Sequence, residues 1–513
     1  MIFLRSKKSF LTMITGIIPI FIIGVLGFVK IRYFIDLLGS EANGLIQIVY
    51  RILSYLSLAE LGLGGALMYK LYKPLAENNH EEISKLIHTA SYFFKKIGIG
   101  IVFFLLIFMF ILPFVIKNNT FDNVYLYIIF LLAGIPYAVE YLWYKKYYIL
   151  IAADQKQYIN NIIFNGCTII YDICIMIALN KGVNLIGYIL VSYPFIIIKG
   201  IVLTKIFKRN YPYVSETKKI DKSSLSLSKD VFVHNIGSAI NNGADQIVLS
   251  IFNGLTFVSI YSSYFYIVKY LKDITNAILK STLYSFGNLF AKEDEINTKG
   301  YDVYKEYLSF SGMFSIIISS SFYFAIVPCI NIWINKPEYI LGFSAIIAFT
   351  LLVYSNIITI PLNIAAGAAG IFKQTKYYSF IATFVNVTLS ILVIKKYQIA
   401  GIVFATIIST LGIWFPLTLR VVYKDVFNKH SRFDYYKEII KSLIIISLTV
   451  LVINIFNLEK FYTGSIVNWI IVSFIFFIVI SLITLVFYYI TDNSYKRFLK
   501  RCINLIRKKG KNK

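Results

Sequence analysis

The sequence predicts an all-α integral membrane protein of about fourteen transmembrane helices, organised as two six-helix halves followed by two further helices. Composition is the first observation: 58% of the 513 residues are hydrophobic and 15% are charged, against roughly 45–50% and about 25% in soluble proteins. The second is that apolar runs of about 20 residues, each long enough to cross a bilayer, recur from end to end. These runs lack the alternation of a membrane β-barrel, so each is expected to be a helix.

The hydropathy pattern places the fourteen predicted spans in chain order. The first six are 9–29, 43–69, 96–116, 123–143, 157–179 and 182–207. The next six are 230–253, 256–283, 307–328, 339–364, 376–394 and 399–421. The last two are 438–456 and 466–490.

The distribution of basic residues predicts the orientation of these spans. The formal net charge is +25, and the side that holds the N-terminus and the even-numbered loops carries about five times as many Lys and Arg residues as the other side. This asymmetry predicts that both termini are cytoplasmic. The charge is therefore explained by topology, and nucleic acid is not an expected partner.

The longest polar interval divides the chain into two halves. Residues 208–229 are rich in Ser and Lys and are expected to form a cytoplasmic linker between an N-lobe (1–207) and a C-lobe (230–421). Two additional spans (422–490) and a basic cytoplasmic tail (491–513) follow, and the tail can lie on anionic headgroups. The segment 39–56 aligns without gaps on 254–271, which gives weak support to a duplication, as in many secondary transporters.

The predicted eighth span carries polar residues at intervals of three and four, which places them on one helix face. Charged residues inside a membrane tend to face a cavity or a partner, so this face is expected to line a cavity and to meet an anionic ligand. The alternative is a structural Lys269–Asp273 pair, with the last lysine reaching the cytoplasm. The residues of this face are Ser262, Tyr266, Lys269, Lys272, Asp273, Asn276 and Lys280.

Polar residues in spans 7, 2 and 5 add further candidates. Span 7 carries His234, Ser238, Asn241, Asn242 and Asp245. Span 2 carries Arg51 on a face with Asn43, Gln47 and Ser54, and span 5 carries Asn161, Asn165, Thr168 and Asp172 in line.

These residue types suggest separate roles. Arg51 can bind a phosphate with two parallel hydrogen bonds or pair with an acid, whereas Gln47, Lys269, Lys272 and Asn276 are expected to share the substrate-binding face. The candidate ion-coupling residues are Asp172, Asp245 and Asp273. For Asp245 the alternative is a hydrogen bond between helices. Three asparagines are expected to add polar groups to the cavity, namely Asn165, Asn241 and Asn242.

Sequence motifs for other classes of chemistry are missing. The chain has no phosphate-binding loop of the GxxxxGK[ST] type, no zinc motif and no nucleophile elbow. No cofactor or metal is therefore expected, and nothing in the sequence supports an enzymatic function.

Several stretches of the sequence are characteristic of one known family. These segments are Gly44-Leu45, 55–64 (YLSLAELGLG) and 71–78 (LYKPLAEN), together with 241–245 (NNGAD) and 251–254 (IFNG). They resemble the Wzx-type polysaccharide flippases of the MOP (multidrug/oligosaccharidyl-lipid/polysaccharide) exporter superfamily. The resemblance implies a MATE/MOP-like fold, with two six-helix lobes around a central cavity, that operates by alternating access. In similar peptidoglycan-precursor flippases, basic residues on spans 1, 2 and 8 meet a diphosphate. Arg51 and Lys269 or Lys272 hold comparable places, but span 1 has no basic residue between Lys8 and Lys30.

The function that the resemblance implies is translocation of undecaprenyl-diphosphate-linked oligosaccharides across a bacterial cytoplasmic membrane, for assembly of a capsule, O-antigen or teichoic-acid-like polymer. One alternative is a cation-coupled multidrug exporter of the same superfamily, and another is a membrane-embedded glycan polymerase or acyltransferase. The expected partners are the lipid-linked oligosaccharide and anionic membrane lipids. A coupling proton or sodium ion and the polysaccharide polymerase, with other assembly proteins, are further candidates.

Overall fold

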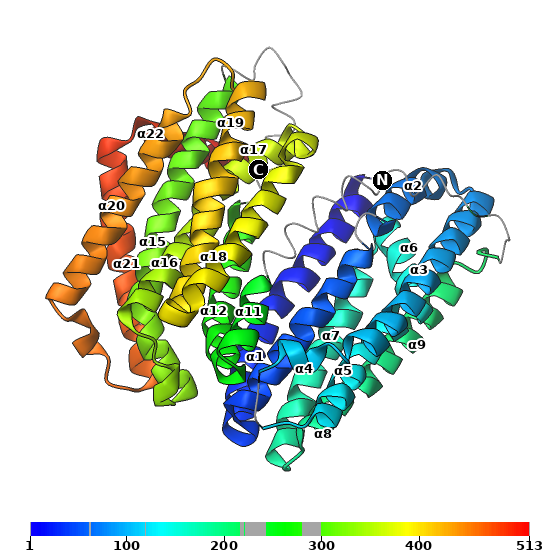
Figure 1. The fold of residues 1–513 in the computed structure, drawn as a ribbon. Helices are drawn as coiled ribbons and strands as arrows, with labels where there is room; N and C mark the ends of the chain where they lie inside the picture. Colours follow the sequence, from blue (N-terminus) through cyan, green and yellow to red (C-terminus); the bar gives the residue numbers. More distant parts are fainter. Residues whose placement is uncertain are drawn as a thin grey trace. The chain divides into compact units, whose positions relative to one another are not determined.

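The computed structural model describes residues 2–60, 63–117, 120–215, 220, 243–279 and 299–511. The chain divides into two compact units, Met1–Ser262 and Ser263–Lys513, and the elements of each unit are given separately. In the described ranges every regular element is helical (Figure 1).

Ten helical segments in the described residues are long and apolar enough to cross a membrane. Two of these segments are interrupted by a residue with a positive φ, at Gly39 (φ 88°) and Gln398 (φ 46°). Both interruptions fall between spans that the sequence predicts as separate, namely spans 1 and 2 and spans 11 and 12. The prediction of an all-α membrane protein with about fourteen spans is confirmed.

The first unit begins with the long helix α1 (Ile2–Ser54), which the Gly39 kink divides in two. The short helix η1 (Tyr55–Glu60) follows it directly. The next elements are α2 (Leu63–Glu77), α3 (His80–Phe108), α4 (Leu112–Val115), α5 (Asn123–Trp143), α6 (Lys145–Ala153), α7 (Gln157–Asn180), α8 (Leu185–Leu190) and α9 (Tyr193–Asn210). The last are α11 (Ala244–Phe252) and α12 (Leu255–Leu279), and the boundary between the units falls inside α12.

The two helices that pack most extensively in this unit are α1 and α7. Pro19 interrupts the backbone hydrogen bonds of α1, because proline has no N–H to donate to the carbonyl four residues earlier. That carbonyl belongs to Thr15, and the Nδ2 of Asn165 donates to it at 3.0 Å. One turn away, the Nδ2 of Asn161 donates to the Thr12 carbonyl at 3.2 Å. The polar face of α7 therefore supplies hydrogen bonds to the backbone of α1.

The first two predicted spans differ from the observed helices at their ends. The first segment of α1 continues past residue 29 as far as the kink at Gly39, so Lys30 and Arg32 lie within a helix rather than in a loop. The predicted second span, 43–69, is not one regular helix, because α1 ends at Ser54 and η1 takes over.

The second unit is organised around α15 (Tyr301–Ile334), which packs against α16 (Phe343–Ile358), α20 (Phe433–Ile455), α21 (Ile466–Thr491) and α22 (Asn493–Lys511) (Figure 1). The remaining elements are η5 (Pro337–Tyr339), α17 (Ile360–Ala368), α18 (Phe372–Ile407), η6 (Ile408–Trp414), α19 (Phe415–Asp425) and η7 (Leu458–Phe461). Side chains of α15 are buried on most of its surface, as expected for a helix surrounded by others.

Candidate functional site

A polar cluster lies in the first unit where α11 meets the second segment of α1. The Nε of Arg51 donates a hydrogen bond to Oε1 of Gln246 at 2.7 Å. The Nε2 of Gln246 in turn donates to Oγ of Ser262 at 2.8 Å, and both of these side chains are buried. The glutamine thereby orients the guanidinium, whose two Nη groups have no hydrogen-bond partner among the described residues.

Asp245 is the acidic member of this cluster, and its side chain is 5% exposed. The buried hydroxyl of Tyr261 donates to its Oδ2 at 2.8 Å. Buried polar groups in membranes are commonly satisfied by hydrogen bonds between helices, and this bond joins α11 to α12. Arg51 and Asp245, which the sequence assigns to different spans, are therefore brought to one region of the fold.

Tyr55 completes the cluster from the first turn of η1. Its hydroxyl is buried and has no hydrogen-bond partner within the described part of the chain. The backbone of Gly243 passes so close that a Cβ there would overlap both this hydroxyl and Cδ of Arg51. The glycine is therefore required for α11 to approach the arginine.

Two contacts between α1 and α12 fix the framework of the cluster. The Nδ2 of Asn43 donates to Oγ of Ser259 at 2.6 Å, with both groups buried. Next to it, Gly44 packs directly on the carbonyl group of Leu255. Gln47 lies one turn before Arg51 and is half-buried. Asn43 thus has a structural contact, whereas Gln47 shares the face of Arg51 as the sequence predicts.

A second charged site joins α1 to α7. The Nζ of Lys30 lies 2.5 Å from Oδ1 of Asp172, and the aspartate side chain is 1% exposed. The same Nζ lies 5.5 Å from the centre of the Tyr171 ring, close enough for a cation–π contact. Asp172 therefore pairs with Lys30, a residue that the sequence places in an outer loop. Asn165, on the same helix as Asp172, donates a hydrogen bond to the backbone of α1.

A third site lies at the junction of α5 and α6. The Nζ of Lys145 lies 3.0 Å from Oε2 of Glu60 and 2.9 Å from Oε1 of Glu140. Burial by itself lowers the pKa of Lys145, but the two carboxylates outweigh this effect and the pKa is raised. Tyr141 also donates to Glu60. Glu60 thus joins η1 to α5 and α6 through Tyr141 and Lys145.

The predicted residues of α12 that follow Ser262 belong to the second unit. Lys269 and Asp273 are exposed, and no ion pair joins these two described side chains. Lys272 and Asn276 are half-buried on the same helix. Five other predicted residues lie outside the described residues, namely His234, Ser238, Asn241, Asn242 and Lys280.

Sequence reasoning missed several contributors to these sites, among them Lys30, Tyr55, Gln246 and Tyr261. A search for every polar residue within an apolar run would have found Gln246, which directly follows Asp245. Tyrosine occurs 40 times in the chain, so neither tyrosine stands out from the sequence. Tyr55 meets Gly243, which is distant in the sequence, whereas Tyr261 donates to Asp245 on the neighbouring helix.

No family model matches the chain, and no curated protein sequence matches it. Several solved structures match its fold. The Lipid II flippase MurJ, in an inward closed conformation, superposes with a TM-score of 0.70 at 17% identity, covering 95% of this chain and 99% of MurJ. This chain has the fold of MurJ.

Two transporters give weaker matches to the same fold. A MATE transporter in a bent conformation covers 82% of this chain with a TM-score of 0.51 at 12% identity. A MATE transporter from Vibrio cholerae covers 84% with a TM-score of 0.50 at 11% identity. The chain is therefore a multi-pass membrane protein with the architecture of flippases and transporters.

Proposed function

We propose that this protein is a flippase for undecaprenyl-diphosphate-linked oligosaccharide repeat units. It moves them by alternating access from the cytoplasmic to the outer leaflet of a bacterial cytoplasmic membrane, with both of its termini in the cytoplasm, for assembly of a surface polysaccharide. The observation that supports this proposal best is the extent of the MurJ match. The MurJ superposition covers 95% of this chain, whereas the superpositions of the two MATE transporters cover 82% and 84% of it.

Arg51 is the residue that we propose to contact the diphosphate. Its Nε is held by Gln246, so the planar guanidinium is oriented in advance, which lowers the entropy lost when a ligand binds. The terminal nitrogens can form the paired hydrogen bonds that a phosphate accepts. We further propose Gln47, Lys269, Lys272 and Asn276 as substrate-binding residues, and Asn165, Asn241 and Asn242 as polar residues of the pathway.

Among the three candidate ion-coupling aspartates, Asp245 has the most suitable surroundings. Asp172 is engaged by Lys30, and Asp273 is exposed. Asp245 is buried, and its Oδ2 accepts a hydrogen bond from the buried hydroxyl of Tyr261 in the same cluster as Arg51. We therefore propose Asp245 as the first position to test for proton or cation coupling.

Replacing Arg51 tests the proposed diphosphate contact. We expect Arg51→Ala to lower surface-polymer export by at least about tenfold at normal protein abundance, because a charge-assisted hydrogen bond contributes roughly 1.5–3 kcal/mol. The measurement is surface polymer per cell in a deletion strain that expresses each variant. The matched control is Arg32→Ala, which removes another arginine of α1, one whose Nε lies 3.6 Å from Oδ2 of Asp36. Wild-type export by Arg51→Ala would rule out the contact.

Cation-coupled export of drugs is the second candidate function, and the MATE likeness favours it. In that case a deletion strain would become more susceptible to such drugs while its surface polymer stayed normal. A polymer defect with unchanged susceptibility supports the flippase.

A further inference from the structure

The last helix, α22, combines a high basic charge with an amphipathic pattern. It contains eight basic residues and no acidic residue between Asn493 and Lys511. It begins two residues after Thr491, the last residue of the spanning helix α21. A basic amphipathic helix that directly follows a spanning helix starts at the membrane surface.

One face of α22 is fixed to α15. Arg501 forms two parallel hydrogen bonds with Glu306, from Nε to Oε2 at 2.9 Å and from Nη2 to Oε1 at 3.1 Å. The Nε of Arg497 lies 3.9 Å from the same carboxylate, which is buried. The ring of Phe498 stacks on Phe310 with centroids 4.6 Å apart. The two arginines are therefore engaged by the protein itself.

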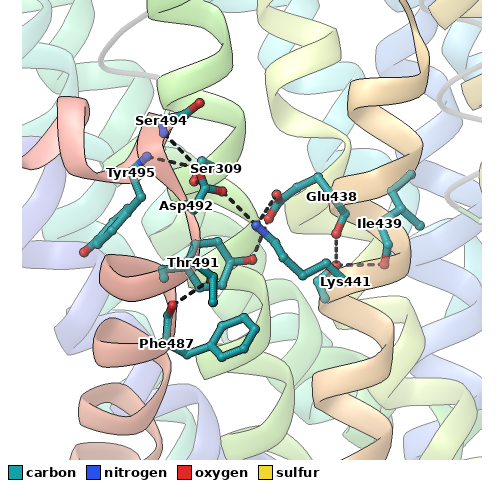
Figure 2. Close-up of polar contacts among 12 residues, drawn as sticks. Ser309, Glu438, Ile439, Lys441, Phe487, Thr491, Asp492, Ser494 and Tyr495 are labelled. Atoms are coloured by element: carbon teal, nitrogen blue, oxygen red, sulfur yellow. Dashed lines mark hydrogen bonds and ion pairs between the residues drawn. The ribbon is translucent and has the colours of Figure 1, made fainter.

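The start of α22 is held by the network around Asp492 (Figure 2). Oδ1 of Asp492 accepts a hydrogen bond from the backbone N–H of Ser494 at 2.8 Å. Oδ2 accepts from Nζ of Lys441 at 2.8 Å and from Oγ of Ser309 at 2.9 Å. Lys441 also pairs with Glu438 at 2.6 Å. Burial raises the pKa of Asp492, but the hydrogen bond and charge of Lys441, together with the hydrogen bonds from Ser309 and the Tyr495 backbone, outweigh this effect and the pKa is lowered.

The other face of α22 is differently composed. Lys496, Lys500 and Ile503 follow one another at intervals of four and three, which places them on one side of the helix. Lys500 is exposed, and Ile503 is 49% exposed. Within the described ranges neither lysine forms an ion pair, although Nζ of Lys496 donates weakly to the Ile490 carbonyl at 3.4 Å. This face presents positive charge beside an exposed apolar side chain.

We propose that this face of α22, formed by Lys496, Lys500 and Ile503, is a docking surface for the headgroups of anionic phospholipids. The lysines contact lipid phosphates, and Ile503 lies at the level of the upper acyl chains. Arg497 and Arg501 do not take part, because Glu306 and the exposed Asp302, 3.7 Å from Nη2 of Arg497, engage them. The two arginines of α22 therefore bind other parts of the protein, whereas the two lysines contact the membrane. The proposal does not depend on the proposed transport substrate.

The test places a thiol probe on the proposed face of the full-length protein. In a Cys502→Ser background, Ile503→Cys is labelled with a water-soluble maleimide in nanodiscs of phosphatidylcholine, with or without 30% phosphatidylglycerol. Three other cysteines lie within spanning helices, namely Cys167, Cys174 and Cys329. The Cys502→Ser protein alone measures their background reaction. We expect labelling to be at least fivefold slower in the anionic discs, and 0.5 M salt to remove most of this difference.

Two double variants separate the two faces at equal charge. Lys496→Gln with Lys500→Gln is expected to remove most of the effect of phosphatidylglycerol, since each basic residue near an anionic surface contributes roughly a factor of five. Arg497→Gln with Arg501→Gln removes the same charge from the protein-facing side and should preserve the lipid effect. Equal labelling in both disc types, or an equal loss of the lipid effect in both double variants, would overturn the proposal. So would protection by a soluble polyanion but not by phosphatidylglycerol.

Discussion

Asp172→Ala is expected to destabilise the protein by about 3–5 kcal/mol, which is the usual cost of removing one partner of a buried ion pair. Asp172 is 1% exposed and Lys30 is 22% exposed, so the substitution leaves a lysine largely shielded from water without its counter-charge. The expected result is a clearly lower midpoint of thermal unfolding in detergent and a lower abundance in membranes.

Two control variants separate charge from packing at this site. Asp172→Asn keeps an oxygen acceptor for Lys30 and should destabilise less than Asp172→Ala. The double variant Lys30→Met with Asp172→Leu removes both charges together and should recover much of the stability. Wild-type unfolding of Asp172→Ala would contradict a structural role for the pair. If the stable double variant also exported polymer normally, the prediction that Asp172 couples ions would be wrong.

Gly44→Val is expected to prevent accumulation of folded protein. A Cβ at this position would overlap the backbone carbonyl of Leu255, and a backbone group cannot move aside as a flexible side chain can. The substitution must separate α1 from the start of α12, and it would disturb the nearby hydrogen bond from Asn43 to Ser259. Fluorescence-detected size-exclusion chromatography of the detergent extract measures the amount of folded protein.

Gly100→Ala is the matched control, because nothing lies within 4 Å of a Cβ built on Gly100 of α3. It should leave the monodisperse peak unchanged or larger, since alanine favours a helix by up to about 1 kcal/mol over glycine. A normal peak from Gly44→Val would show that the two helices do not approach as closely as the fold requires.

The number and type of the helices could be predicted because lipid imposes a simple rule on length and polarity. Several turns between helices contain a residue that tolerates a positive φ, as at Gly182, Gly254 and Asn335. The end of the first span could not be predicted. The charge of Lys30 indicates the end of a membrane span. In the fold, Asp172, which lies 142 residues later in the chain, pairs with Lys30, so the helix can continue past it.

The candidate site was predicted in part. Arg51 and Asp245 were identified because charged groups are rare in membrane helices, and the fold brings their helices together. The contact that Asn165 makes could not be predicted in the same way. Its amide meets a carbonyl that Pro19 leaves without a helical partner, and that match depends on which helices are neighbours. Periodicity identifies a polar face but does not identify the helix that the face contacts.

The measurement that tests the proposed function most directly is the leaflet distribution of the lipid-linked oligosaccharide in a deletion strain. Intact spheroplasts and inverted vesicles are treated with a membrane-impermeant reagent that modifies the glycan. The flippase proposal predicts that the intermediate accumulates on the cytoplasmic face, and that the wild-type gene, but not Arg51→Ala, returns it to the outer face. Normal delivery to the outer face without the gene would contradict the proposal.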